Sequence, residues 1–343
     1  MKKILYAIQG TGNGHISRAR DIIPELKKYA DVDILISGTQ SDLDIDTSIK
    51  YRLGGLGFVF GKKGGIDIIK TFREASIIRF LKEIFQLPIR DYDLVINDFE
   101  PVSAWASKLR NVPCVSLSHQ CALLFEETPR PTKLDRFGWW ILKKYAPSQK
   151  QYGFHFKSYH QQVSTPVIRK QIREAQVSVK PHYTVYLPSF SEQYLIKKLN
   201  KIKGVKWQVF SKHASESFVK GNVQVFPLSN KDFIKSMAES SGVLCGAGFE
   251  TPAEALFLVK KLLVIPMRSQ TEQFFNAQSL KEMGVMVIKN LKKGNLMKLQ
   301  YWVDYGEIIS VNYPNMTADI IAGIAGDFLV EEKDFSLIQK LVY

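Results

Sequence analysis

The sequence has few cysteines and no long apolar run, and each shortage excludes a class of protein. Its 343 residues include three cysteines, Cys114, Cys121 and Cys245, and no CxxC pair. An odd total without paired spacing argues against a disulfide framework and indicates a reducing compartment. No apolar run approaches the roughly 18 residues that a membrane-spanning helix needs. The first apolar stretch is too short for a signal peptide, so we expect a cytoplasmic protein that begins with a strand.

Acidic residues are also scarce relative to basic ones. The chain has 33 Asp and Glu against 47 Lys and Arg, which gives a net charge of +14. Such a chain can bind nucleic acid, anionic lipid or anionic small molecules, or can simply carry a solvated basic surface. Zinc-finger spacing, an RNP-like signature and an Arg-rich run are all missing. Nucleic acid is therefore not an expected partner, and we expect no metal or organic cofactor.

What the sequence does contain is a repeated alternation of apolar runs and amphipathic stretches. Continuous apolar strands separated by helices indicate parallel sheets covered on both faces. The length favours two domains, and an irregular, proline-containing stretch near 160–180 suggests a boundary, giving domains 1–165 and 166–343 with the last helix packing back on the first. The expected strands are 3–9, 32–38, 93–98 and 113–119, then 183–189, 206–211, 223–227, 242–248, 262–266 and 285–288.

The first strand ends in a glycine-rich loop with Gly10, Gly12, Gly14 and then His15. The loop lacks the GK[ST] ending of a Walker A motif, and its third glycine comes too early for GxGxxG. The strand at 32–38 ends without an acidic residue for an NAD ribose. At the carboxyl end of a parallel sheet, beside glycines, His15 is expected to point into the cleft where such folds bind ligands.

A second glycine loop, Gly246-Ala247-Gly248, ends the run at 242–248, whose buried part ends at Cys245, and leads into a helix that we expect to begin near Thr251. A helix N-terminus behind a loop of small residues is suited to binding a diphosphate. Glu254 has two interpretations. It can close a capping box with Thr251, or its carboxylate can accept hydrogen bonds from ribose hydroxyls.

Taken together, GTGNGHISRA and CGAGFETPAEALFLVKKLLVIPMRSQTEQFFNAQSL resemble the GT-B glycosyltransferases. The resemblance is closest to the family 28 group, which includes the peptidoglycan N-acetylglucosaminyltransferase and the galactolipid synthases, and extends to macrolide and plant-type enzymes. It implies two facing Rossmann-like domains, the second holding a nucleotide-diphosphate sugar and the first an acceptor. The donor residues that it implies are Gly12, Asn13, Gly14, Ser189, Phe226, Leu228, Gly246, Ala247, Gly248, Glu254, Gln270, Glu272 and Gln273. The stretch 266–276 is shorter than in the peptidoglycan enzyme, and Glu272 stands where glutamine is usual, so the sugar stays open.

Sugar transfer requires a base for the acceptor hydroxyl, and histidine can serve as one at neutral pH. His15 matches the histidine that is the base in plant-type relatives. A carboxylate that orients the imidazole would assist it; Asp98 is the first candidate and Glu100 the second. His119 is a further option, although its position at a strand end favours a hydrogen-bonded structural histidine. The resulting hypothesis is an inverting, metal-independent transferase using a UDP-sugar. The alternatives are a nucleotide-sugar epimerase or hydrolase, or a non-catalytic nucleotide-sugar-binding protein.

Two segments in the first half combine apolar and basic residues. Residues 129–150 include Trp139 and Trp140 among lysines and arginines, and residues 70–90 predict a basic amphipathic helix. Basic residues beside tryptophans suit an anionic membrane surface. The alternative is that both are ordinary helices packed on the sheet. A membrane contact would place the protein on the inner face of the cytoplasmic membrane and make the acceptor a lipid or lipid-linked sugar rather than another glycan.

Overall fold

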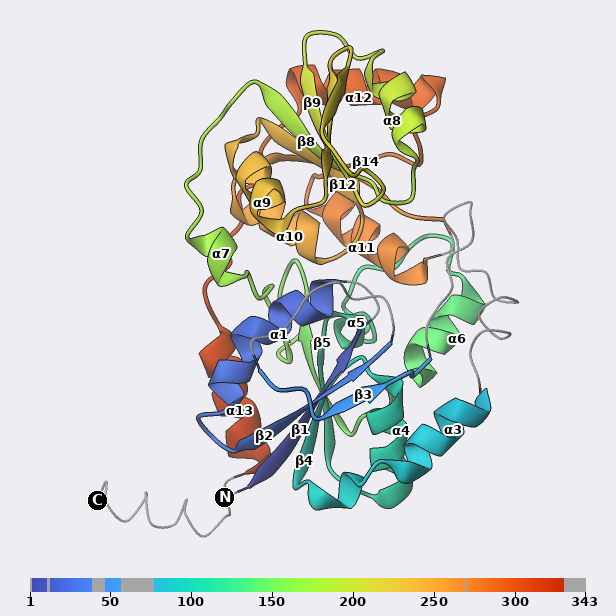
Figure 1. The fold of residues 1–343 in the computed structure, drawn as a ribbon, viewed down its shortest axis with the longest axis vertical. Helices are drawn as coiled ribbons and strands as arrows, with labels where there is room; N and C mark the ends of the chain where they lie inside the picture. The colour runs from blue at the N-terminus through green and yellow to red at the C-terminus, as the bar shows by residue number, and fades with distance from the viewer. Residues whose placement is uncertain (1, 11–12, 39–46, 57–76, 269, 330–343) are drawn as a thin grey trace.

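The computed structural model describes residues 2–10, 13–38, 47–56, 77–268 and 270–329. In this part of the chain, two sheets lie one above the other and each is flanked by helices (Figure 1). The predicted α/β architecture of two facing, doubly wound parallel sheets is confirmed.

The lower sheet in Figure 1 is built from the first half of the chain, in the order β3-β2-β1-β4-β5-β6-β7. Its described strands pair in parallel. The apolar central strands are almost wholly buried, as parallel strands covered on both faces should be. The strands are β1 (Lys3–Gln9), β2 (Asp31–Ser37), β3 (Tyr51–Leu53), β4 (Leu94–Asp98), β5 (Cys114–Ser118), β6 (Lys150–Phe154) and β7 (Val163–Ser164).

The upper sheet has the order β10-β11-β9-β8-β12-β13-β14. Its described strands are parallel apart from the short antiparallel pair β10–β11 at one edge. The strands are β8 (His182–Tyr186), β9 (Lys206–Ser211), β10 (Phe218–Lys220), β11 (Val223–Pro227), β12 (Gly242–Gly246), β13 (Lys261–Ile265) and β14 (Met286–Val287).

Helices connect these strands and cover the two faces of each sheet. The first half contains α1 (Asn13–Leu26), α3 (Ile77–Gln86), the 3-10 turn η1 (Ile89–Asp91), α4 (Pro101–Arg110), α5 (His119–Ala122) and α6 (Arg136–Lys144). The second half and the crossing segments contain α7 (Lys170–Arg173), α8 (Glu192–Leu199), α9 (Asn230–Glu239), α10 (Glu250–Phe257), α11 (Thr271–Glu282), α12 (Lys293–Tyr305) and α13 (Thr317–Phe328).

Alternate side chains of β1 belong to different cores. Leu5 and Ala7 pack with residues of α3 and α4. Ile4, Tyr6 and Ile8 belong to a core that includes α1 and continues into β12 and α10 of the second half. The two halves are therefore connected by a packed apolar interface in addition to the polypeptide segments that join them.

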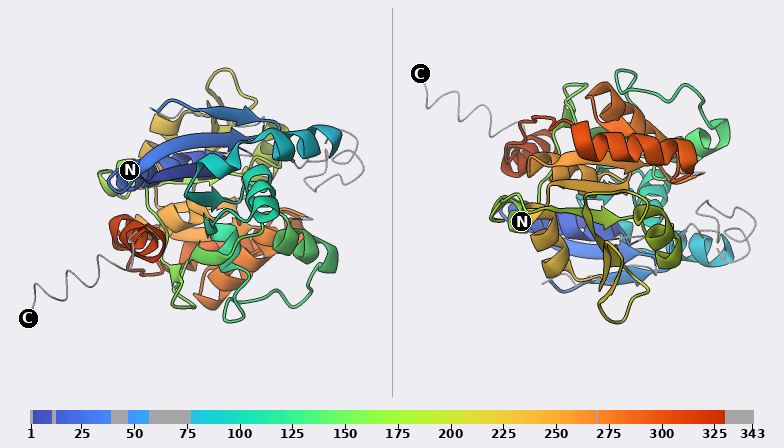
Figure 2. Two further views of the ribbon diagram at one scale, coloured as in Figure 1. Left: turned by 90° about the horizontal axis from the view of Figure 1, so that it is seen from below. Right: turned by 90° about the horizontal axis from the view of Figure 1, so that it is seen from above.

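The chain passes between the halves at two places. Residues 165–181, which include α7, lead up to the second sheet, and residues 306–316 lead back down (Figures 1 and 2). The last helix of the described chain, α13, then packs beside α1 on the first half. No helix of the described residues is both long and apolar enough to cross a bilayer.

The expected strands include none between 113–119 and 183–189, and this part of the prediction is wrong. β6 and β7 lie in that stretch and extend the first sheet at its edge. Their short sequences, KQYGF and VS, mix polar residues and glycine with apolar ones, so they lack the continuous apolar run of a central strand. Gly12 and residues 70–76 of the predicted basic helix lie outside the described residues.

Candidate active site

His15 lies in the first turn of α1, directly above the end of β1. Its Nδ1 is 2.8 Å from Oδ1 of Asp98, the last residue of β4. β1 and β4 are neighbours, with Ile8 paired to Asp98, and the strand order reverses there, where α/β sheets form their ligand crevice. With the ring proton on Nδ1 donated to Asp98, Nε2 is left as an acceptor. The contact suits the orienting role expected of Asp98, and that catalytic role stays a prediction.

Arg18 completes this cluster and was missed by the sequence analysis. One of its terminal nitrogens donates to both carboxylate oxygens of Asp98, at 2.8 Å each, and the other donates to Oε1 of Glu250. The side chain is 1% exposed. The sequence could have indicated Arg18, because it is three residues after His15 and residues at this spacing share a helix face. Glu250 is the first residue of α10, so Arg18 joins the two halves of the chain.

The charges in the cluster affect one another. Burial alone would raise the pKa of Asp98, but the guanidinium of Arg18 and the hydrogen bonds from His15 and Arg18 outweigh it and lower that pKa. Asp98 is therefore ionised at neutral pH. Burial raises the pKa of Glu250 to about 7, against the lowering effect of Arg18.

The other ring nitrogen of His15 faces an amide. Nε2 of Gln120 lies 3.3 Å from Nε2 of His15 and 3.1 Å from Oε2 of Glu272. Because an amide nitrogen is a donor, this contact agrees with an unprotonated Nε2 on His15. Gln120 belongs to α5 and Glu272 to α11, so this chain of contacts also crosses between the halves.

His119 has a structural environment. Its ring stacks on Phe249 with centroids 4.0 Å apart, and its Nδ1 is 3.2 Å from the carbonyl oxygen of Phe154. Burial lowers the pKa of His119 well below the usual value, and neighbouring His155 lowers it further. A buried neutral imidazole with these contacts fits the structural interpretation better than the catalytic one.

Glu100 does not orient His15 in this structure, which corrects its place as second candidate. Its carboxylate caps α4 by accepting hydrogen bonds from the backbone N–H groups of Val102, at 2.8 Å, and Ser103, at 2.6 Å. The side chain is fully buried. Pro101 follows as the first helical residue, so EPVS is an N-terminal helix signal.

The second glycine loop lies between β12 and α10, as predicted, but the capping box is wrong. α10 begins at Glu250 with Phe249 as its N-cap residue, which has no side-chain capping bond. Thr251 is therefore already inside the helix. A Cβ on Gly248 would meet nothing within 4 Å, so packing does not demand glycine there and the space is open.

The carboxylate of Glu254 forms an ion pair with Arg169, which lies in the segment that joins the two halves. Arg169 donates to both of its carboxylate oxygens, with 2.8 Å between Nη2 and Oε2. Arg169 also donates to Oδ1 of Asn230, at 2.9 Å. The ribose contact expected of Glu254 stays a prediction, and it requires Arg169 to share or release this carboxylate.

Apart from Asn13 of α1, the remaining predicted donor residues lie at or beyond the carboxyl ends of β8, β11 and β13. Gln273 accepts a hydrogen bond from the backbone N–H of Met267, at 2.9 Å, and Gln270 precedes α11 without a side-chain cap. Phe226 stacks on Phe210 with centroids 5.3 Å apart, and Leu228 follows β11. Half-buried Ser189 follows β8, while the side chain of Asn13 lies outside the described residues.

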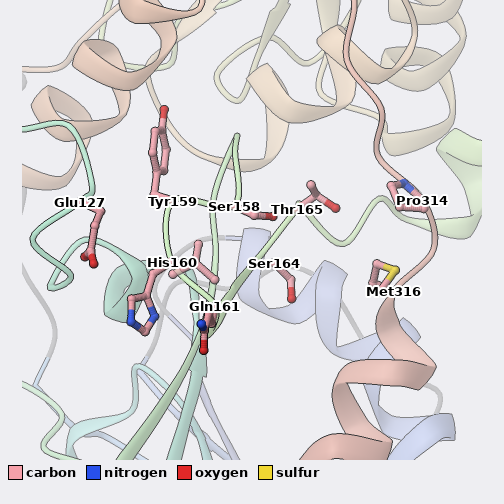
Figure 3. Close-up of a pocket in the computed structure, with 10 residues that line it drawn as sticks. Glu127, Ser158, Tyr159, His160, Gln161, Ser164, Thr165, Pro314 and Met316 are labelled. Atoms are coloured by element: carbon pink, nitrogen blue, oxygen red, sulfur yellow. The ribbon is translucent and has the colours of Figure 1, made fainter.

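Two cavities are lined mainly by residues of the first half of the chain. One of about 130 Å³ reaches Gln120 and is bounded by Phe99, Leu142 and Lys143. The other, of about 800 Å³, lies between the loop joining β6 to β7 and the segment entering α13 (Figure 3). Its lining combines hydroxyl groups, among them those of Ser164 and Thr165, with apolar side chains such as Met316. No predicted site residue lines the larger cavity.

Two facing parallel sheets whose ligand-side loops meet define the GT-B fold. Solved structures align with this chain over nearly its whole length. MnaA of S. aureus with UDP is 12% identical, with a TM-score of 0.63, over 96% of this chain and 98% of that one. UGT89C1 of Arabidopsis thaliana with UDP is 14% identical, with a TM-score of 0.57, over 99% of each chain. MurG of Acinetobacter baumannii is 14% identical, with a TM-score of 0.54, over 95% and 100%. At these identities the likeness establishes the fold.

The family follows from the sequence itself. A comparison with curated proteins gave no match. The family model for glycosyl transferase family 1 matches residues 2–303. The chain belongs to that family and is a glycosyltransferase, which confirms the resemblance carried by the two glycine loops.

Proposed function

We propose that this chain is an inverting, metal-independent hexosyltransferase that uses a UDP-sugar. Family membership supports sugar transfer, and UDP is the ligand in two solved structures of this fold. The observation that carries the mechanism is the 2.8 Å contact between His15 and Asp98 at the interface of the two halves.

In the proposed reaction, the acceptor hydroxyl oxygen attacks the anomeric carbon opposite the diphosphate. The bond between that carbon and the diphosphate oxygen breaks, and the nucleoside diphosphate leaves with the electron pair, so the configuration inverts. The hydroxyl proton passes to Nε2 of His15. Asp98, held ionised beside Arg18, keeps Nδ1–H in place and stabilises the imidazolium that forms.

The loop at Gly246-Ala247-Gly248 is the proposed seat of the diphosphate. Its backbone N–H groups and the first turn of α10 offer positive dipole ends to the leaving group. The open space at Gly248 allows an approach that a side chain would obstruct.

A thermal-shift panel tests this function. UDP and UDP-sugars at saturating concentration should raise the melting temperature, whereas inorganic phosphate at the same concentration should not. Incubation with the donor that binds then separates the candidates. Sugar transfer to an added acceptor supports the proposal, while an isomer or free sugar without acceptor indicates an epimerase or hydrolase. No shift with any nucleoside diphosphate or nucleotide sugar would contradict nucleotide-sugar use.

For the acceptor, we propose a lipid or lipid-linked sugar reached at an anionic membrane surface. α3 and α6 lie on the same flank of the first half (Figure 1), and both helices expose apolar side chains. Trp140 of α6 is 58% exposed and Ile78 of α3 is 82% exposed. Trp139, in contrast, stacks on Phe275 of α11 at 5.2 Å and is only half-exposed. Basic residues on both helices, among them Lys82 and Lys144, favour an anionic surface.

A further inference from the structure

The proposed proton transfer does not use Arg18 directly, yet Arg18 is among the largest fully buried side chains of the protein. Its guanidinium lies 3.2 Å from Nδ1 of His15 and binds both oxygens of Asp98. These partners belong to the first half of the chain. The remaining partner, Glu250, belongs to the second half.

A buried cation beside an imidazole opposes the protonation that a general base must undergo. In this cluster, the negative charges of Asp98 and Glu250 can balance the positive charges of Arg18 and protonated His15. When His15 takes the acceptor's proton, two cations are balanced by two anions. Without Glu250, the protein's own groups in this cluster would carry a net positive charge after the same step, which is costly in a buried site.

We propose that Arg18 is a positioning residue that makes His15 an effective base only while Glu250 of the second half balances its charge. This inference rests on the proposed function, since it assigns His15 the role of base. Arg18 keeps Asp98 ionised and in place, and Glu250 removes the electrostatic penalty that Arg18 would impose. Contact between the two halves thereby prepares the base for proton transfer.

The other titratable groups that face the cluster do not supply this balance. Glu254 is already bound by Arg169. Burial raises the pKa of Tyr6 well above its usual value, and Glu272 accepts a hydrogen bond from Gln120 rather than from Arg18. Burial likewise keeps His119 neutral. Glu250 is thus the carboxylate that contacts Arg18 from the second half.

The titration of Glu250 sets the direction of the pH effect. Burial raises its pKa to about 7, so Glu250 is mostly ionised at pH 8 and loses its charge as the pH falls. The balancing charge is therefore present at mildly alkaline pH and declines in acid. The Glu250→Gln variant should resemble the protein with a protonated Glu250 at every pH.

Steady-state kinetics of Glu250→Gln test the proposal. At pH 8 we expect kcat to fall about 10-fold or more, a loss within the usual worth of a general base, while KM for the donor changes little. The acid limb of the kcat/KM profile should move to lower pH by about half a unit or more. Glu239→Gln, which removes another ion-paired glutamate of the second half, should leave both unchanged. An unchanged profile in Glu250→Gln would overturn the inference.

Two further measurements separate this inference from the proposed function. The NMR signal of the His15 ring, assigned by its loss in His15→Gln, should titrate at lower pH in Glu250→Gln than in the unaltered protein, whether or not turnover is observed. Glu250→Asp keeps the charge on a shorter side chain and should restore at least half of that shift. If Glu250→Gln and Glu250→Asp shift the signal equally, side-chain shape matters and charge does not, which overturns the proposal. A shifted signal in a protein without transferase activity would contradict the proposed function alone.

Discussion

His15 is the residue on which turnover should depend most. His15→Ala should lower kcat by about 10²- to 10⁴-fold, the usual worth of a positioned general base, with the Kd for the nucleotide-sugar donor little changed. Asp98→Asn should lower kcat less, because Asp98 orients the ring and does not take the proton. Stopped assays of product formation at saturating donor, with donor Kd from calorimetry, would measure both effects.

His213→Ala is the matched control for that experiment, because His213 is an exposed histidine of the second half. It should behave as the unaltered protein. Near-full turnover in His15→Ala would mean that His15 is structural and that another group accepts the proton.

Glu254 and Arg169 give a second prediction at the residue scale, because each should affect donor binding in a different direction. Glu254→Gln should raise the donor Kd by about 10-fold or more, the worth of a hydrogen bond to a charged group. Arg169→Gln frees the carboxylate that the ribose would use, so the donor Kd should stay the same or fall. Both changes break the buried ion pair and should lower the melting temperature. Equal weakening of donor binding by both would show that Glu254 serves the ion pair alone.

These residues also show what the sequence could and could not predict. The contact between His15 and Asp98 follows from two strand ends in an alternating pattern, because parallel strands end at one edge. Arg18 could have been found from its helical spacing. Arg169 and Glu254 are far apart along the chain, in an irregular segment and a helix, and no local pattern brings them together.

At the scale of elements, prediction was most accurate for runs rich in β-branched and aromatic residues. β1, β9 and β11 have the predicted bounds, because Val, Ile, Tyr, Phe and Trp favour strands over other structures. The partly polar strands β6 and β7, which lie toward one edge of the first sheet, were not predicted. The start of α10 was misplaced because Thr251 and Glu254 fit a capping box locally, whereas the packing of Phe249 against His119 and the contact of Glu250 with Arg18 begin the helix earlier.

Gly14 supplies a prediction at the element scale, because α1 meets α10 at this residue. A Cβ there would lie 2.9 Å from Cγ of Glu250, so Gly14→Ala should displace Glu250 from Arg18. Displacements of about 1 Å near a site can cost 10²-fold in rate, and kcat should fall while the protein stays folded by circular dichroism. Gly323→Ala in α13, where a Cβ meets nothing within 4 Å, should keep kcat and raise stability by about 0.5–1 kcal/mol. Full activity in Gly14→Ala would contradict a close approach of the two helices during turnover.

At the scale of the whole molecule, the two halves are held by one apolar core and by buried polar contacts that centre on the proposed site. The core joins β1 and α1 to β12 and α10, and Arg18–Glu250 and Gln120–Glu272 cross the same interface. The sequence indicated two sheets, since each has its own strand pattern. The sequence could not predict the distance between the two sheets, because this distance depends on contacts between side chains from segments far apart along the chain.

The whole molecule also presents a charged surface whose partner can be identified by vesicle binding. With a net charge of +14, the protein should sediment with phosphatidylserine-containing vesicles and much less with phosphatidylcholine vesicles, and salt should weaken the binding because it screens exposed charges. Trp140→Ser should reduce sedimentation, since Trp140 is exposed on α6 beside Lys143 and Lys144. Tyr301→Ser removes a comparably exposed aromatic ring from α12 of the second half and should have no effect.

If both variants bind as the unaltered protein does, any attraction is a general effect of net charge, and α6 is not the membrane-facing helix. Equal recovery in the supernatant with both lipids would contradict the membrane proposal, and with it the reason to expect a lipid acceptor.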